Sequence, residues 1–111
     1  MSDLDKKHCV PCEGGASPLD QDMINEMMKE IHCDWQLNTD NKEIQRLFKF
    51  GDFHKTMDFV NKVANIAHDE DHHPDMEVSY SKCLVRYSTH AVGGLSINDF
   101  ICAARIDLLI E

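Results

Sequence analysis

The spacing of apolar residues along this 111-residue chain changes repeatedly between a helical and a strand period, and this alternation constrains the fold most strongly. Helical spacing, with an apolar residue every three or four positions, covers residues 19–31, 53–67 and 97–108. Alternation of apolar and polar residues covers 35–37, 44–50, 76–80 and 83–87. The predicted element order is therefore α-β-β-α-β-β-α. This order is typical of an α+β fold, in which helices pack on one face of a four-stranded antiparallel sheet.

Local sequence signals indicate where the three helices begin. The segment 17–20, Ser-Pro-Leu-Asp, has a capping Ser, a Pro at the first helical position and an acid three residues after the cap. Asp52, after Gly51, can cap the second helix. The predicted apolar stripe of that helix consists of Phe53, Met57, Val60, Val63, Ala64 and Ala67. The segment 96–99, Ser-Ile-Asn-Asp, is a capping box that begins the third helix and gives Asp99 a structural role.

The chain is expected to form one domain that follows a short arm. Residues 1–16 contain Pro11, Gly14 and Gly15 and have no periodicity, so we expect a flexible N-terminal arm. Residues 17–111 are enough for one hydrophobic core. Hydrophobic residues make up 42% and charged residues 28% of the chain, values close to the globular average that disfavour a disordered or fibrous protein.

Charge and hydropathy exclude two classes of partner. Twenty acidic and 11 basic side chains give a formal net charge of -9, which repels polyanions and argues against direct binding to nucleic acid or to an anionic membrane. Apolar runs fall short of the roughly 20 residues that cross a bilayer, and residues 1–7 are polar with no apolar segment behind them. We therefore expect a cytoplasmic protein.

The five cysteines are an odd number without a secretion signal, which favours reduced thiols over a disulfide framework. Cys9 and Cys12 form a Cys-x-x-Cys pair. A zinc site would need further ligands, for which His8, His32 or Cys33 are candidates. Structural or incidental use of the pair is the favoured interpretation, and metal or redox use is the alternative.

The two strands 76–80 and 83–87 are expected to form a hairpin. If residues 81–82 are a two-residue turn, Glu77 lies opposite Arg86, an opposite-charge pair that supports this register. Continued outward, the same register sets His73 opposite His90. It thereby predicts a site at the open end of the hairpin.

Histidines are concentrated at this end of the hairpin. The segment 68–74, His-Asp-Glu-Asp-His-His-Pro, places three acids among three histidines where the second helix must end. His72 adjoins His73, and Ser88 and Thr89 adjoin His90. Histidine titrates near neutral pH, so this cluster predicts proton transfer by His72, His73 and His90.

Other chemistries fit the cluster less well. His68 and His72 are four residues apart and would share a helix face, but His-Asp-Glu-Asp-His matches neither zincin motif, so no metal is expected. Cysteine nucleophiles fall outside the predicted site. Gly93 and Gly94 join the last strand to the third helix and are not part of a phosphate-binding loop.

Several of these residues together resemble the signature of the pterin-4a-carbinolamine dehydratases, also known as dimerisation cofactors of a homeodomain factor. The residues that carry the resemblance are His68, His72-His73-Pro74, Tyr80, Ser88-Thr89-His90, Gly94-Leu95-Ser96 and Asp99. The Cys9-x-x-Cys-x-Gly-Gly segment also resembles the N-terminal extension of bacterial members. The element order over residues 17–111 is similar to the family fold.

The resemblance implies a dehydratase that needs no cofactor. It implies removal of water from 4a-hydroxytetrahydropterin to give quinonoid dihydropterin, as part of tetrahydrobiopterin-type cofactor recycling after aromatic amino-acid hydroxylation. By the same resemblance, His72, His73 and His90 surround the reacting carbon. The residues implied to hold the pterin ring are Asp71, Ser88 and Thr89. His68, where the family often has an acid, and Asp99, which can cap a helix, are secondary candidates.

The resemblance also supports a second class of function. The family includes proteins that bridge transcription-factor dimers, so a protein-binding module that acts as a coactivator is the alternative. Open edges of a four-stranded sheet favour association, and a homodimer or homotetramer is expected.

Overall fold

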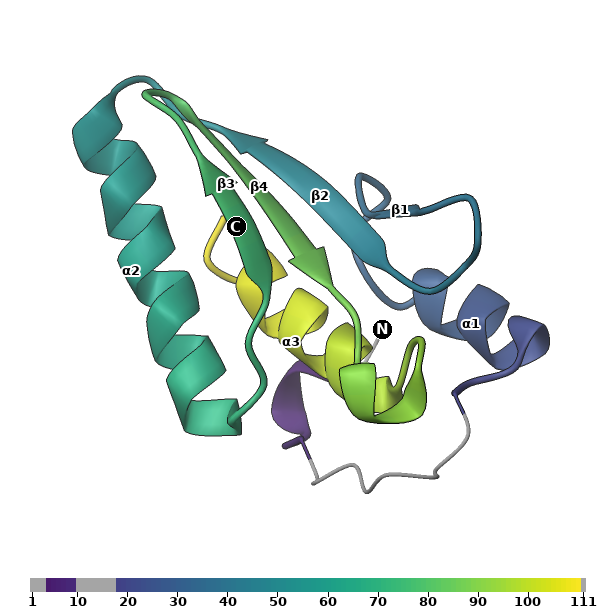
Figure 1. Cartoon of the computed structure of the whole chain (residues 1–111). Coiled ribbons are helices and arrows are strands. Elements are labelled where there is room, and N and C mark those ends of the chain that lie inside the picture. The colour runs from purple at the N-terminus through teal and green to yellow at the C-terminus, as the bar shows by residue number, and fades with distance from the viewer. Residues whose placement is uncertain (1–3, 10–17, 111) are drawn as a thin grey trace.

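The computed structural model describes residues 4–9 and 18–110 and has the predicted α+β architecture (Figure 1). Its elements are η1 (Leu4–Lys6), α1 (Gln21–Met28), β1 (Gln36–Leu37), β2 (Ile44–Lys49), α2 (Phe53–Glu70), β3 (Asp75–Val78), β4 (Lys82–Tyr87), η2 (His90–Val92) and α3 (Ile97–Asp107). The strands form one antiparallel sheet in the order β1-β2-β4-β3, and the three α-helices lie together on one side of it. Fold class and element order are thus confirmed, with two short 3₁₀ helices added.

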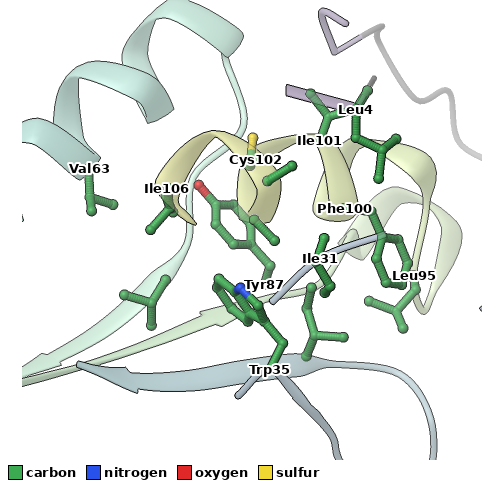
Figure 2. Packing of buried hydrophobic residues seen from close by; sticks show 14 of the residues in the cluster. Leu4, Ile31, Trp35, Val63, Tyr87, Leu95, Phe100, Ile101, Cys102 and Ile106 are labelled. Carbon is green, nitrogen blue, oxygen red and sulfur yellow. The ribbon is translucent and has the colours of Figure 1, made fainter. Parts of the chain in front are cut away.

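Alternation along the two central strands places the core. In β2 the buried side chains are Ile44, Arg46 and Phe48, and in β4 they are Cys83, Val85 and Tyr87. These side chains face the helices, and Phe100 and Ile106 of α3 together with Trp35, just before β1, complete the packing on that side (Figure 2). One buried charge interrupts this apolar face.

That charge, Arg46, belongs to a polar junction between sheet and helix. Its Nη1 lies 2.6 Å from Oδ1 of Asp107, the last residue of α3. The same carboxylate oxygen accepts a hydrogen bond of 2.8 Å from Nε1 of Trp35, and its other oxygen accepts one of 3.0 Å from the backbone N–H of His32. Asp107 therefore joins β2, α3 and the segment between α1 and β1.

The first helix is shorter than predicted at both ends. It begins at Gln21, because the carboxylate of Asp20 accepts the backbone N–H of Met23 at 2.9 Å and takes the capping role expected of Ser17. Ser17 itself lies outside the described residues. The helix ends at Met28 instead of near His32, where the chain is drawn toward Asp107.

The second and third helices begin as predicted. Asp52 caps α2 by accepting the N–H of Lys55 at 2.8 Å, and the helix runs two residues beyond the predicted end near His68. Ser96 and Asp99 form the predicted capping box of α3. No described helix has both the length and the apolar character needed to span a bilayer.

The predicted hairpin register is wrong by two residues. In the structure Asp75 pairs with Arg86 and Val78 with Cys83, so the turn is Tyr80-Ser81 instead of residues 81–82. Contacts outside the hairpin fix this turn. Thr56 Oγ1 of α2 donates to the carbonyl oxygen of Tyr80 at 3.0 Å. The N–H of Phe50, just after β2, donates to the carbonyl oxygen of Ser81 at 2.7 Å.

The consequences of this shift are limited. A two-residue shift preserves which face each side chain occupies, because strand side chains alternate with a period of two. Glu77 is level with Leu84 instead of Arg86, yet its carboxylate still pairs with the Arg86 guanidinium diagonally. The predicted pairing of His73 with His90 does not form, since the ladder ends at Asp75.

Of the predicted N-terminal arm, the structure describes residues 4–9. Leu4 is buried, and the short helix η1 lies against α3 (Figure 1). Residues 10–16, which include Cys12, lie outside the described residues.

Candidate active site

A cavity of about 640 Å³ opens between the end of α2, the end of β4 and the beginning of α3. Its size is that of a site for a small organic molecule. The lining includes all six residues that the sequence assigned to catalysis or substrate binding: Asp71, His72, His73, Ser88, Thr89 and His90. The site is thus assembled even though the register that led to it is not the one observed.

The end of α2 delivers the first part of this group. Asp71 ends the helix in the left-handed conformation, with φ of 50°, and its N–H donates to the carbonyl oxygen of His68 at 3.3 Å. The N–H of His72 turns back to the carbonyl oxygen of Ala67 at 3.1 Å. Asp tolerates this backbone better than most residues. The reversal sets His72 and His73 side by side on the cavity wall before β3 begins.

A closed loop after β4 delivers the second part. Thr89 pairs with Gly94, with its N–H donating to the Gly94 carbonyl oxygen at 2.8 Å. Gly93 has φ of 70°, a conformation that favours glycine, and closes η2. His90 is the first residue of this short helix and is exposed on the cavity.

His72 is the most strongly positioned of the three histidines. Its Nε2 lies 2.6 Å from Oδ1 of Asp99, a carboxylate that is fully buried. The imidazole stacks on Tyr87, with ring centroids 5.4 Å apart and an angle of 12° between planes. Because a carboxylate only accepts hydrogen bonds, Nε2 carries a proton, and Nδ1 is the nitrogen that can gain or release one.

The environment of His72 favours its charged form. Burial lowers the pKa of His72, but the hydrogen bond and negative charge of Asp99 raise it, and the balance lies above the ordinary value. His72 therefore keeps its proton to a higher pH than a solvent-exposed histidine does. Such a group is suited to donate a proton near neutral pH.

Asp99 has two roles at once. Its Oδ2 accepts the N–H of Ser96 at 2.9 Å, which completes the capping box, and the hydroxyl of Thr89 at 2.8 Å. Its Oδ1 holds His72. The sequence predicted the cap but not the contact with His72, because the two residues are 27 positions apart and no local pattern relates them.

His68 and a surface group of metal-ligand residue types stand apart from the cavity. His68 is exposed on α2 and does not contribute to the cavity lining. Among the described residues, the one group that meets the geometric requirement for a metal site is His32, Cys33 and Asp34, which are consecutive and exposed. This group includes none of the cavity histidines.

Residues that the sequence did not assign to the site also line it. They are His8, Cys9, Asp69, Glu70, Ala91 and Asn98. Glu70 was visible as part of an acidic run, and Cys9 as part of the Cys-x-x-Cys pair. Neither pattern indicates that residues 61 positions apart meet, with the N–H of Cys9 2.7 Å from Oε1 of Glu70.

Comparisons with known proteins match almost the whole chain. The family described as pterin 4 alpha carbinolamine dehydratase matches residues 17–109. A protein of Nitrosomonas eutropha, provisionally named a pterin-4-alpha-carbinolamine dehydratase, is 52% identical over 110 residues, which is 99% of this chain and 96% of that protein. A protein of Legionella pneumophila strain Corby with the same name is 48% identical over 109 residues, 98% of this chain and 96% of its own length.

Solved structures give the same result for the fold. A transcriptional coactivator/pterin dehydratase from Brucella melitensis superimposes with a TM-score of 0.80 at 27% identity, covering 86% of this chain and all of the other. A pterin dehydratase-like protein described as a RuBisCO assembly factor of the alpha-carboxysome superimposes with a TM-score of 0.61 at 19% identity, covering 70% of this chain and 90% of the other. The second likeness concerns the fold alone.

Proposed function

We propose, since this chain belongs to the pterin 4 alpha carbinolamine dehydratase family, that it removes water from 4a-hydroxytetrahydropterin and releases quinonoid dihydropterin. This reaction would serve the recycling of a tetrahydrobiopterin-type cofactor. One observation carries the proposal: His72, held by the buried Asp99, lines the same cavity as His73 and His90.

The reaction requires two proton transfers. The bond between C4a and oxygen breaks with its electron pair on the hydroxyl group, which takes a proton and leaves as water. The lone pair of N5 forms the new C4a=N5 double bond, and a base takes the N5 proton. The enzyme gives one proton and receives one, so its net protonation is unchanged. Positioned acids and bases typically accelerate such steps by about 10²- to 10⁴-fold.

The raised pKa of His72 supports its assignment as the acid. Its Nδ1 would donate to the departing hydroxyl group while Nε2 stays bonded to Asp99. The base for N5 is then His73 or His90, both exposed to the cavity.

Two of the remaining cavity residues can hold the pterin ring. Asp71 has an exposed carboxylate that can accept hydrogen bonds from the amino group and ring N–H of a pterin. Ser88 is half-buried at the end of β4. The hydroxyl of Thr89 is already bonded to Asp99 and Ser96, so we assign Thr89 to the support of Asp99.

The activity can be tested directly. Purified protein is mixed with chemically generated 4a-carbinolamine, and dehydration is followed by ultraviolet absorbance. We expect the rate to exceed that in buffer alone and to increase with protein concentration. A rate equal to that of the buffer would refute the proposed activity.

Single substitutions then test the roles of the histidines. His72→Ala, His73→Ala and His90→Ala are each expected to lower kcat by about 10²- to 10⁴-fold. His54→Ala is the matched control, because His54 is exposed at the beginning of α2 and does not contribute to the cavity lining. A cavity variant that retains the full kcat and an intact thermal transition removes that histidine from acid–base catalysis.

A second candidate function, protein binding, is supported by the incomplete edge of β2. The strand β1 pairs only with Ile44 and Gln45, so in the described structure residues 46–49 lack a neighbouring strand on that side. Leu47 and Ile110 are exposed beside this edge, around a hollow of about 1080 Å³. Such an edge can pair with a second copy of the chain, which would give a homodimer or homotetramer.

Light scattering on the purified protein tests this association. We expect a dimer or tetramer that Leu47→Lys dissociates and that Met23→Lys, at an exposed site on α1, leaves intact. A wild-type monomer at all concentrations would refute it. A role as a coactivator would further require that substitutions at this edge, and not at the histidines, abolish the cellular effect.

A further inference from the structure

The described part of the N-terminal arm forms one side of the substrate cavity. His8 and Cys9 line the cavity together with the predicted catalytic histidines. Both residues precede position 17, where the match to the family begins. Their contribution therefore comes from the N-terminal segment, outside the residues that match the family.

A buried carboxylate holds this segment in place. The side chain of Glu70, at the end of α2, is only 4% exposed. One of its oxygens accepts the N–H of Cys9 at 2.7 Å, and the other lies 2.9 Å from Nδ1 of His8. An acid is unfavourable at the C-terminal end of a helix, so these donors stabilise a charge that α2 alone would not.

The net charge on Glu70 follows from the same contacts. Burial raises the pKa of Glu70, whereas the bond from Cys9, the bond from His8 and the charge of Arg105 lower it, and the net direction is downward. Glu70 is thus a carboxylate at neutral pH. A carboxylate only accepts, so Nδ1 of His8 donates to it, and Nε2 is the ring nitrogen left to bind a ligand.

One face of α3 completes the attachment. Nη2 of Arg105 donates to the carbonyl oxygen of Lys7 at 2.6 Å. Sγ of Cys9 lies 3.6 Å from the carbonyl oxygen of Asn98 and 3.6 Å from Sγ of Cys102. Positions 98, 102 and 105 lie on one side of a helix, and Leu4 belongs to the same core cluster as Cys102 (Figure 2). The segment is therefore bound at both of its ends.

His72 and His8 differ in how deeply they are buried in the cavity. The side chain of His72 is 13% exposed, whereas that of His8 is 78% exposed. We propose that a pterin whose reacting carbon lies near His72 extends its C6 substituent toward His8, and that His8 selects the substrate by a hydrogen bond between its Nε2 and a hydroxyl group on that substituent. This inference rests on the proposed dehydratase function.

The test compares two carbinolamines, one with a dihydroxypropyl group at C6 and one with a methyl group. We expect wild-type protein to prefer the hydroxylated substrate in kcat/KM by about 2- to 10-fold, the value of one hydrogen bond. His8→Ala should reduce this ratio to near one by lowering kcat/KM for the hydroxylated substrate more than for the methyl substrate. His54→Ala, the exposed control on α2, should retain the wild-type ratio.

Glu70→Gln provides a second variant, because it removes the charge that orients His8 without removing the imidazole. It should also lower the ratio, and His8→Ala added to it should lower the ratio no further. An unchanged ratio in His8→Ala, or an equal loss for both substrates, would overturn the proposal.

Binding measurements separate this inference from the proposed reaction. Calorimetric titration with 7,8-dihydrobiopterin and with 6-methyl-7,8-dihydropterin should show the same preference in wild type and its loss in His8→Ala. If neither carbinolamine is dehydrated faster than in buffer, the proposed activity fails, and the binding ratio still decides the role of His8.

Discussion

Replacing Asp99 by Asn tests whether a buried carboxylate controls the protonation of His72. Asn has nearly the same shape as Asp, and its carbonyl oxygen can still accept the N–H of Ser96 that caps α3. Its amide nitrogen, however, is a donor and would face Nε2 of His72, now held by a carboxylate oxygen at 2.6 Å. The substitution therefore removes the charge and favours the wrong tautomer of the imidazole.

The magnitude follows from the strength of this one contact. A hydrogen bond to a charged group contributes about 1.5–3 kcal/mol. Its loss from the charged form of His72 should lower the pKa of His72. Asp99 raises the pKa of His72 in the wild type. The charged form of His72 is therefore lost only on the alkaline side of the pH profile. Asp99→Asn should move that limb to lower pH, with kcat there reduced about 10- to 100-fold.

The assay is the pH dependence of kcat, together with an NMR titration of the His72 ring assigned by its absence in His72→Ala. Ser96→Ala is the control, because it weakens the cap of α3 by about 0.5–2 kcal/mol and leaves the contact between Asp99 and His72 in place. It should lower the melting temperature without moving the alkaline limb. An alkaline limb in Asp99→Asn that coincides with the wild type would refute the assigned role of Asp99.

Two further predictions concern stability, both measured by urea denaturation. Asp71 has φ of 50°, a backbone conformation that glycine adopts easily and valine does not. Asp71→Gly should therefore be at least as stable as the wild type, whereas Asp71→Val should lose about 1–2 kcal/mol. Both variants should raise KM, since each removes the carboxylate proposed to bind the pterin. Asp107→Ala should cost about 3–5 kcal/mol, because Arg46 is only 8% exposed and would lose its nearest partner. Asp58→Ala, which removes an exposed pair within α2, should change stability by less than about 1 kcal/mol and serves as the control for Asp107.

The elements of the fold were predictable because local patterns specify them. Alternation over β2 and β4 and the caps at Asp52 and Ser96 depend on residues close in sequence. Which face of α2 is buried was less predictable from the sequence. Its buried face is Thr56, Phe59, Val63, Ala67 and Glu70, rotated from the predicted apolar stripe.

Two polar residues explain that rotation. Thr56 is buried because its hydroxyl donates to the carbonyl oxygens of Asp52 and Tyr80, and Glu70 is buried because the N-terminal segment binds it. Because both residues are polar, a hydrophobicity pattern predicts that they lie on the surface. Their partners lie elsewhere in the chain, so no periodicity of α2 could have revealed this face.

The predicted site residues line one cavity for a reason that differs from the predicted one. The argument from the hairpin required His73 to face His90 across two strands, and the ladder ends before either residue. What brings them together is the termination of two elements. Asp71 reverses the chain at the end of α2, and the Thr89–Gly94 bridge reverses it after β4, so both histidines lie just beyond the ends of these two elements.

This difference matters for what the site can tolerate. A pair of residues on a ladder depends on register, and a two-residue slip would separate them by a distance of about 7 Å. Residues at element ends depend instead on caps. His72 is held by Asp99, which is itself the cap of α3, so the acid of the proposed reaction and the beginning of a core helix share one carboxylate. Substitutions that weaken that cap should therefore affect stability and proton transfer together, except where, as in Asp99→Asn and Ser96→Ala, the two oxygens are perturbed separately.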